Sequence, residues 1–165
     1  MNNKLKSSDL VADLQTAAVC GLFCPSCGVY QATIEDDQAR LQQIAEKLNQ
    51  PVDETRCTGC RSAVVSLHCR DCRFVACASQ KDIAFCGSCT EFPCDDLKAF
   101  QRKAPHRAEL WQNQAHIRSA GWENWFQEMK QHYACETCQT INSAYDLKCR
   151  SCEQVPPNNF VKTNS

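Results

Sequence analysis

The cysteines of this chain carry the clearest chemical signal in its sequence. The chain has 165 residues, of which 15 are cysteine. Most of them form pairs separated by two residues: Cys24/Cys27, Cys57/Cys60, Cys69/Cys72, Cys86/Cys89, Cys135/Cys138 and Cys149/Cys152. Two thiolates at this spacing can point out of one tight turn and fill two corners of a tetrahedron. The pattern therefore predicts metal ligation.

The remaining sequence favours a reducing compartment for these thiols. Residues 1–19 contain Lys4 and Lys6 but no continuous apolar stretch of the kind found in a secretion signal. No run approaches the roughly 18 apolar residues that a membrane span requires. Because disulfides are disfavoured in the cytosol, the pattern there indicates metal binding rather than cross-linking. We expect a cytoplasmic protein.

We predict that every cysteine of the chain ligates metal, and that the cofactor is zinc. Closed zinc sites take four thiolates, so the chain would hold several ions, about three or more. Segments between the pairs are too short to bury much apolar surface, so bound metal would be part of the folding equilibrium. The predicted ligands are Cys20, Cys24, Cys27, Cys57, Cys60, Cys69, Cys72, Cys77, Cys86, Cys89, Cys94, Cys135, Cys138, Cys149 and Cys152.

The last four cysteines have the layout of a zinc ribbon, Cys-x2-Cys-x10-Cys-x2-Cys. Two cysteine turns would bring four sulfurs to one ion, and the ten-residue insert would form a short hairpin through Asn142 and Ser143. Gln139 and Glu153 stand where such turns often carry glycine. The motif predicts a closed structural zinc site in the C-terminal segment.

The first three cysteines allow more than one interpretation. Cys24-Pro25-Ser26-Cys27-Gly28 is typical of a zinc turn, and it also resembles the Cys-Pro-x-Cys of thiol oxidoreductases. With Cys20 added, the spacing becomes that by which radical S-adenosylmethionine enzymes hold a four-iron cluster. The chain lacks the length and the apolar strands for the barrel of those enzymes. Zinc ligation is favoured here, and a 4Fe–4S cluster at Cys20, Cys24 and Cys27 is the alternative.

The eleven cysteines before the ribbon do not divide by four. Residues 69–77 and 86–94 repeat the spacing Cys-x2-Cys-x4-Cys. One economical partition gives one ion Cys57, Cys60, Cys69 and Cys72, gives a second ion Cys77, Cys86, Cys89 and Cys94, and leaves the first three cysteines without a fourth ligand. An outside ligand or a histidine could complete that set, although each histidine is more typical of an ordinary surface or packed residue. The histidines are His68, His106, His116 and His132.

Apolar spacing predicts the elements that would position these ligands. We expect helices over 7–19, over 37–48, from Asp95 to the break at Pro105, over 106–119, and from Trp122 onward. The region 57–94 should consist of turns with little regular structure. The fold class is thus a small metal-stabilised α plus irregular fold. Its parts are a 1–19 helix or tail, a 20–104 cysteine-rich multi-metal domain, a 105–131 helical segment, and a 132–165 ribbon and tail.

Large apolar residues after Gly121 recur at helical spacing, which favours a packing face over a partner surface.

The formal charge of -1 counts thiols as neutral. Zinc held by four thiolates carries about two negative charges, so a loaded chain would be acidic and nucleic acid would be disfavoured. No catalytic arrangement of serine, histidine, cysteine and acid is evident, and Glu35, Asp36 and Asp37 are typical of a helix start. We therefore do not expect an enzyme.

The leading hypothesis is a zinc-binding protein of interaction or regulatory type, with another protein as its partner and no membrane. The alternative is an iron–sulfur redox or sensing protein. Cys20-Gly21-Leu22, Cys57-x-Gly59-Cys60 and Cys89-x-Glu91-Phe92-Pro93-Cys94 together resemble a family of small cysteine-rich bacterial and archaeal proteins of unknown function, which are regarded as metal-binding. The resemblance covers about residues 18–100, and some members are also similar near Gly121–Trp125 and in a terminal ribbon. It implies metal ligation by these cysteines and no reaction.

Overall fold

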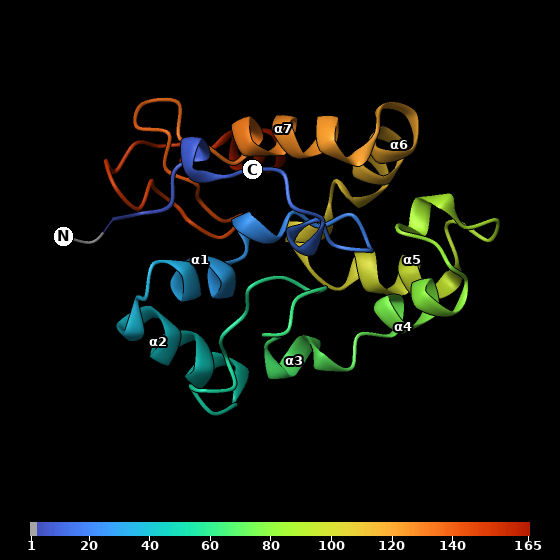
Figure 1. The fold of residues 1–165 in the computed structure, drawn as a ribbon. Helices are drawn as coiled ribbons and strands as arrows, with labels where there is room; N and C mark the ends of the chain where they lie inside the picture. The colour runs from blue at the N-terminus through green and yellow to red at the C-terminus, as the bar shows by residue number, and fades with distance from the viewer. Residues whose placement is uncertain (1–2) are drawn as a thin grey trace.

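The computed structural model describes residues 3–165, in which short helices alternate with irregular turns (Figure 1). The α-helices are α1 (Gly28–Ile34), α2 (Gln38–Leu48), α3 (Leu67–Arg70), α4 (Arg73–Gln80), α5 (Asp95–Arg102), α6 (Leu110–Ala120), α7 (Trp122–His132) and α8 (Asn159–Asn164). The 3-10 turns are η1 (Ser7–Asp9), η2 (Leu14–Thr16), η3 (Cys24–Ser26), η4 (Cys86–Ser88) and η5 (Pro105–Arg107). Over these residues the only β pairing is isolated bridges, so the predicted α plus irregular class is confirmed. None of the helices described is long and apolar enough to cross a membrane.

Helix α2 forms where the apolar spacing predicts it. The Asp37 carboxylate accepts a hydrogen bond from the Arg40 N–H at 3.0 Å, which satisfies one of the free donors of the first turn. Leu41 and Ala45 are buried on one face. Asn49 ends the helix in the left-handed region at φ 51°. Asp37 therefore has the helix-start role that the sequence indicates.

The predicted helix over 7–19 is wrong. Two 3-10 turns occupy this segment, and the Asp13 carboxylate accepts a hydrogen bond from the Gln15 N–H at 2.9 Å. Such local bonds offer the backbone an alternative to a helix. Val11 is 81% exposed, while Leu10 is buried in the core, so the apolar residues do not share a helical face.

Residues 57–94 are more regular than their spacing predicts, because they contain the helices α3 and α4. Three helices of the chain begin directly after a cysteine. Cys27, Cys72 and Cys94 are the N-cap residues of α1, α4 and α5. The N-terminus of a helix has a partial positive charge, which favours a neighbouring thiolate. The sequence pattern shows the cysteine turn, but the helix that follows it is short and weakly periodic.

One hydrophobic core, which we call core 1, joins the two ends of the chain. Phe23 lies at its centre, with ring centroids 5.0 Å from Phe126 and 6.0 Å from Trp125 in edge-to-face contacts. Leu5 from the N-terminal segment and Ile141 from the ribbon segment belong to the same cluster. The buried residues of α7 confirm that its aromatic stripe is a packing face.

A second cluster, core 2, lies under the cysteine-rich region. Its buried members are Ala18, Val19, Cys20, Phe74, Ala78, Leu97 and Leu110. Cys24 is partly buried and contacts both clusters. The side chain of Gln114 on α6 is fully buried beside core 2, where Nε2 donates to the Val19 carbonyl at 3.0 Å and Oε1 accepts from the Gly87 N–H at 2.8 Å. Helix α6 therefore fixes the Cys20 turn against η4.

The N-terminal segment runs beside the C-terminal loops, as Figure 1 shows by the blue and orange ribbons. The Ser7 N–H donates to the Gln139 carbonyl at 2.9 Å, and the Ile141 N–H donates to the Leu5 carbonyl at 2.8 Å. The segment expected to form the ribbon thus shares backbone pairing and a core with residues far earlier in the chain.

Candidate metal centre

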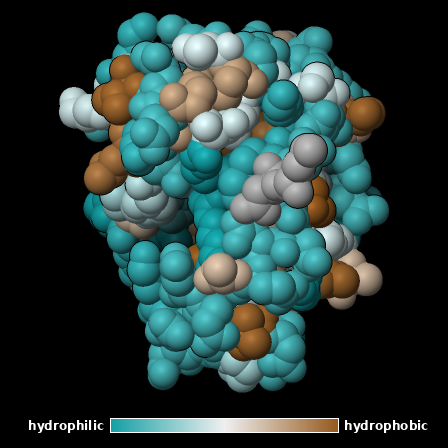
Figure 2. All heavy atoms as spheres, turned by 90° about the vertical axis from the view of Figure 1, so that its left-hand side faces the viewer, coloured by the Kyte–Doolittle hydropathy of each residue, from teal (hydrophilic) through white to brown (hydrophobic). Residues whose placement is uncertain are grey.

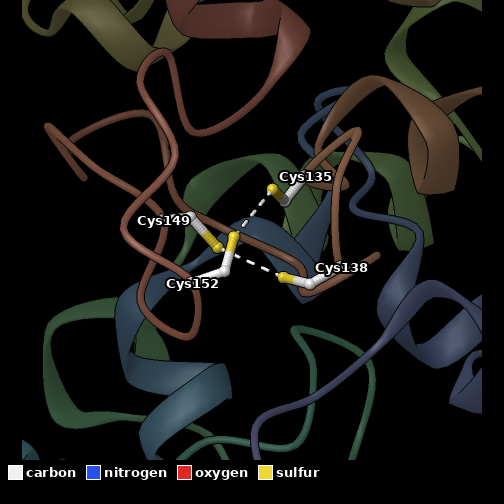
Figure 3. Close-up of side chains that lie close together, drawn as sticks. All are labelled: Cys135, Cys138, Cys149 and Cys152. Carbon is white, nitrogen blue, oxygen red and sulfur yellow. Dashed lines mark hydrogen bonds between the residues drawn. The ribbon is translucent and has the colours of Figure 1, made fainter.

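Four sulfurs of the C-terminal segment gather at one point (Figure 3). The Sγ atoms of Cys135, Cys138, Cys149 and Cys152 all lie within 4.8 Å of one another. Cys135 and Cys152 are 3.6 Å apart, and Cys138 and Cys149 are 3.5 Å apart. Zinc–sulfur bonds of about 2.3 Å give a tetrahedron with edges of about 3.8 Å. The four side chains therefore fit a tetrahedral thiolate site for a metal ion.

Two similar turns place these sulfurs. The Gln139 N–H donates to the Cys135 carbonyl at 2.9 Å, and the Glu153 N–H donates to the Cys149 carbonyl at 3.0 Å. Gln139 and Glu153 both have φ of 63°, the left-handed conformation in which a glycine is common. The backbone thus makes the expected turn at both positions despite the missing glycines.

Backbone pairs close each turn. Around the first, the Cys135 N–H donates to the Thr140 carbonyl at 2.9 Å and the Asn142 N–H to the Tyr133 carbonyl at 2.9 Å. Around the second, the Cys149 N–H donates to the Gln154 carbonyl at 2.8 Å. These bonds define the backbone of both turns and place the sulfurs of each pair side by side.

The local field at this site favours ionised sulfur at Cys138. Burial opposes ionisation, but hydrogen bonds with the Thr140 hydroxyl and N–H and with the sulfurs of Cys152 and Cys149 lower the pKa of Cys138 to about 6. Cys135 and Cys149 are almost fully buried. A hydrogen bond with the Gln154 N–H lowers the pKa of Cys152, but burial and hydrogen bonds with the other three sulfurs outweigh it and raise that pKa to about 12. Without metal the four sulfurs therefore share their protons unequally, and a bound ion would displace those that remain.

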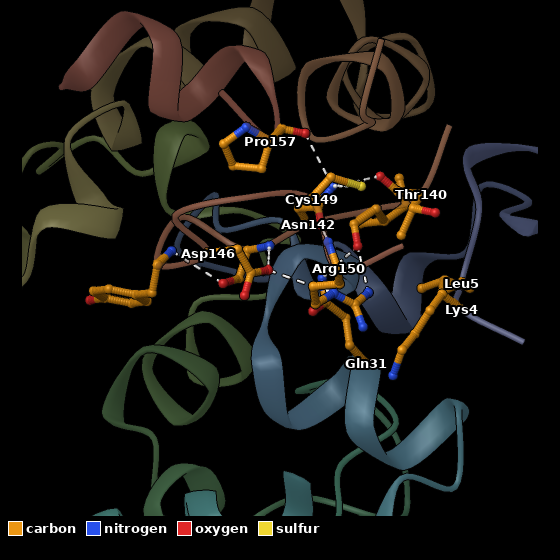
Figure 4. A network of polar contacts seen from close by, with 12 residues as sticks. Lys4, Leu5, Gln31, Thr140, Asn142, Asp146, Cys149, Arg150 and Pro157 are labelled. Carbon is orange, nitrogen blue, oxygen red and sulfur yellow. Dashed lines mark hydrogen bonds and ion pairs between the residues drawn. The ribbon is translucent and has the colours of Figure 1, made fainter. Parts of the chain in front are cut away.

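The insert between the two turns is not the predicted hairpin. The Asn142 side chain is buried at its centre (Figure 4). Its Nδ2 donates to the Thr140 carbonyl at 2.9 Å and to the Pro157 carbonyl at 3.1 Å, while its Oδ1 accepts from the Arg150 N–H at 2.9 Å. Nδ2 also lies 3.5 Å from Cys149 Sγ. A buried amide takes the place of strand pairing here, because its hydrogen bonds are all satisfied locally.

Charged residues attach this site to α1 and α2 (Figure 4). Arg150 forms two hydrogen bonds with Glu35, which also pairs with Lys4 at 3.2 Å. Burial raises the pKa of Glu35, but hydrogen bonds from Arg150 and from the Leu5 N–H outweigh it and leave the pKa below its usual value. Asp146 lies 3.6 Å from both Arg40 and Arg150. Glu35 thus joins the ends of the chain rather than starting a helix.

The other eleven cysteines are arranged differently. Among the residues described, the terminal four form the only set of three or more ligand atoms mutually within 4.8 Å. Several of the eleven nevertheless pack on core 2, namely Cys20, Cys24, Cys60, Cys72, Cys86 and Cys94. Cys20 is buried, whereas Cys27 and Cys77 are exposed. The first three cysteines therefore have unequal surroundings: one in the core, one half-buried and one at the surface.

Glycines of the sequence motifs explain how these segments approach each other. A Cβ on Gly59 would lie 2.2 Å from the Gln15 carbonyl oxygen, and Gly59 has φ of 127°. Gly21 has φ of 93°, and a Cβ there would lie 2.9 Å from Gln114 Nε2. Only glycine fits both the backbone angle and the contact at these positions. The turns carrying Cys20 and Cys60 therefore come close to the chain around them.

Each histidine considered as a fourth ligand has another neighbour. His68 Nδ1 lies 2.9 Å from the Ser66 hydroxyl, and His106 Nδ1 lies 2.6 Å from the Tyr145 hydroxyl. His116 and His132 pair with the carboxylates of Glu128 and Glu109.

One contact of a cysteine was not indicated by the sequence: Lys81 Nζ lies 3.3 Å from Cys89 Sγ and also pairs with Glu91. A lysine beside a thiolate was not visible from spacing, because Lys81 lies outside the cysteine pairs.

Comparison with known proteins places the larger part of these cysteines in one family. No curated protein and no solved structure matches the chain. Residues 16–99 match the family described as "Protein of unknown function (DUF3795)". This match spans the cysteines from Cys20 to Cys94 and the glycines of their turns, and it covers just over half of the 165 residues. The chain therefore belongs to this family of proteins of unknown function.

Proposed function

We propose that this chain is a zinc-binding protein of interaction or regulatory type, in which zinc holds the fold and the C-terminal segment is a zinc ribbon. The gathering of four sulfurs in paired turns is the observation that carries this proposal. Four thiolates complete a tetrahedron and leave no position for a substrate, which is typical of a structural site. When bound, zinc would be held by Cys135, Cys138, Cys149 and Cys152 and would supply folding free energy rather than a reaction.

The surface beside the ribbon supports a protein partner. Leu147 is 85% exposed, Val155 is 66% exposed and Tyr145 is 59% exposed, and all three flank the cysteine turns. Exposed aromatic and aliphatic side chains near a rigid turn can anchor a protein interface. The face drawn in Figure 2 is mainly hydrophilic, with brown side chains in small separate groups.

The charges near the ribbon favour a protein partner over nucleic acid. Lys148 pairs with Glu153, Lys162 lies 3.6 Å from Glu136, and Arg150 pairs with Glu35. Each of these basic groups already faces a carboxylate, and a bound tetrathiolate ion would add about two negative charges. A phosphate backbone requires free basic groups to release its counterions.

Metal analysis of protein purified without air and without a metal-binding tag tests the metal. We expect zinc, no visible absorption, and at least one equivalent that resists a weak chelator. A brown sample that bleaches in air would instead establish an iron–sulfur cluster. Less than one equivalent of metal in freshly reduced protein would overturn both the zinc proposal and the iron–sulfur alternative.

Photo-cross-linking in cells tests the partner surface. A photoreactive residue at Leu147 should give a discrete protein adduct, whereas the same residue at Val11, which is equally exposed on the N-terminal segment, should not. Equal adducts at both positions, or an RNA adduct at Leu147, would contradict the proposed surface.

A further inference from the structure

A hydrogen bond joins the loop between the two C-terminal cysteine turns to the 3-10 turn η5. His106 Nδ1 lies 2.6 Å from the Tyr145 hydroxyl, and the two rings meet edge to face with their centroids 5.5 Å apart. Tyr145 is nevertheless 59% exposed. An aromatic side chain that faces solvent is therefore fixed beside η5.

The second partner of His106 determines the direction of this hydrogen bond. Arg107 Nε donates to His106 Nε2 at 3.4 Å. Because a guanidinium only donates, Nε2 is the unprotonated nitrogen and the ring proton lies on Nδ1. Burial and the charge of Arg107 also lower the pKa of His106 to about 4, so the ring is neutral near pH 7. His106 therefore donates to the Tyr145 oxygen, and the Tyr145 O–H is left to donate to an acceptor outside the chain.

Three basic side chains beside this pair have no carboxylate partner among residues 3–165. They are Arg102, Lys103 and Arg107, and the first two are exposed. Lys98, earlier in the same helix α5, differs from them because its Nζ lies 3.1 Å from Asp95 Oδ1. Basic groups without a carboxylate favour a partner that carries negative charge.

The guanidinium of Arg107 is held in place by its own segment. It lies over the Phe100 ring, 3.5 Å from the ring centroid, and Nη1 donates to the Phe100 carbonyl at 2.7 Å. Gln101 Nε2 donates to the Arg107 carbonyl at 3.4 Å. A side chain that is already fixed loses less conformational freedom when it binds a partner.

The chain forms an open hollow at these basic groups. Its volume is about 280 Å³, and its lining includes Gln101, Arg102, Lys103 and Pro105. Sites that enclose a small molecule usually have about 300 to 1,000 Å³. The hollow is smaller and open to solvent, so it fits a side chain of a segment that lies across the surface.

An apolar group lies close by in sequence. Leu147 is 85% exposed and follows Tyr145 by two positions in the same loop. Lys148, the next residue, already pairs with Glu153. The free basic groups thus form a short set beside an apolar side chain. A phosphate backbone requires a longer track of free basic groups, whereas a few carboxylates require only this set.

We propose that Arg102, Lys103, Arg107 and Tyr145 recognise an acidic segment of the partner protein, with Leu147 as the apolar contact beside them. The inference rests on the proposed function and deepens it, because it names the chemistry of the partner. Carboxylates of the segment would pair with the basic groups and accept the Tyr145 O–H. An apolar residue next to those carboxylates would cover Leu147.

Fluorescence anisotropy with labelled peptides tests this recognition on the full-length, zinc-loaded chain. The probe is a short peptide with one leucine among glutamates, and the matched probe has glutamine in place of every glutamate. An oligouridylate of the same charge is the third probe. We expect the acidic peptide to bind at least about tenfold more tightly than either of the others, and its binding to weaken as salt is raised.

Paired variants locate the binding. Lys103 and Lys47 are both exposed and lie at the C-terminal ends of helices α5 and α2. Lys103→Gln should weaken binding of the acidic peptide by about threefold, as loss of an exposed ion pair does, whereas Lys47→Gln should leave it unchanged. Tyr145→Phe should also weaken binding, because it removes the O–H donor and keeps the ring.

Three results would overturn the acidic-segment surface: equal binding of the glutamate and glutamine peptides, equal effects of Lys103→Gln and Lys47→Gln, or tighter binding of the oligouridylate. Zinc content measured on the same samples separates this inference from the proposed function. A zinc-loaded chain that does not bind the acidic peptide refutes the surface alone. A chain that binds the peptide but retains no zinc refutes the zinc proposal alone.

Discussion

Arg150 and Glu35 form a paired contact across 115 residues of sequence. Nη1 of Arg150 lies 2.8 Å from Oε2 of Glu35, and Nη2 lies 3.0 Å from Oε1. Arg150 directly follows Cys149, and Glu35 ends α1. The contact therefore connects the second cysteine turn of the C-terminal segment to the helix that follows Cys27, so the four gathered sulfurs are attached to the cysteine-rich part of the chain.

Removing the charge of Glu35 should destabilise the protein. Glu35 is 2% exposed at its side chain, and Glu35→Gln would leave Arg150 with Asp146, 3.6 Å away, as its remaining carboxylate. Removing one partner of a buried pair costs about 3 to 5 kcal/mol when the other charge is left unpaired, so we expect a loss of about 2 kcal/mol here. Glu46→Gln on the exposed face of α2 is the matched control and should change stability by less than about 0.5 kcal/mol. Denaturant unfolding of the zinc-loaded proteins measures both effects. If Glu35→Gln were as stable as the native chain, the pair would contribute nothing to stability.

The contribution of Glu35 should depend on pH in a defined direction. Its pKa in the folded protein lies below the usual 4.5, so its stabilisation is fully present above about pH 4.5 and is lost as pH falls through the folded-state pKa. The difference in unfolding free energy between the native chain and Glu35→Gln should be constant near neutral pH and should shrink below about pH 4.5. If this difference in unfolding free energy grew as the pH fell, the pKa of Glu35 would be raised by folding rather than lowered.

Replacing a buried ribbon ligand should remove metal and local order together. Cys149→Ser should lose about one zinc per chain, because metal binding and folding are one equilibrium in a closed site. Ser151→Ala, two residues away on the same turn and exposed, should retain full zinc content. Metal analysis and near-ultraviolet circular dichroism of the two proteins make the comparison. Full zinc content in Cys149→Ser would exclude this residue as a ligand.

The ribbon segment should not be removable without damage to the rest. Its contiguous ligands suggest independence, but Ile141 and Phe160 lie in core 1 with Phe23 and Trp125. A chain ending at residue 132 would expose these aromatic rings, each worth several kcal/mol when buried. We expect loss of the near-ultraviolet signal of Trp125 and a lower midpoint of thermal unfolding. A truncated chain with the native signal would establish two independent units.

Cys20 and Cys27 should respond differently to the same substitution. Cys20→Ser places a hydroxyl in core 2, where an unsatisfied polar group costs about 1 to 3 kcal/mol in addition to any lost metal bond. Cys27→Ser changes an exposed side chain and should alter metal content while the helices remain. Far-ultraviolet circular dichroism with metal analysis separates the two effects. If Cys27→Ser lost helix content while Cys20→Ser changed only the metal content, this prediction would be wrong.

The sequence predicted those parts of the structure that are set by neighbouring residues. Helix α2 and its caps, the aromatic face of α7 and the left-handed turns at Gln139 and Glu153 all depend on spacing within a few positions. Contacts between distant segments were not predictable in this way. Glu35 has the appearance of a helix-start residue, and Asn142 that of a turn residue, because the partners that define them lie far away or fold around them.

The same distinction holds for the cysteines. The four terminal cysteines follow one another in the sequence, so their spacing was sufficient to group them. For the eleven earlier cysteines, the packing of Cys20 and Cys60 depends on Gly59 lying against Gln15 and on Gln114 reaching Val19. Neither contact leaves a periodic signal. Spacing identifies cysteine turns, while only the three-dimensional structure shows which turns lie close together.

The pairing of Ser7 with Gln139 has a consequence for the order of events on the ribosome. These residues are separated by 132 positions, and at about 5 to 20 residues per second the later one is synthesised about 7 to 26 s after the earlier one. During that interval Leu5 and Phe23 lack the partners that bury them in the finished protein. The thiols from Cys20 to Cys94 are all synthesised within the same period. The contacts that bury these two apolar side chains therefore cannot be completed until the C-terminal segment has been synthesised.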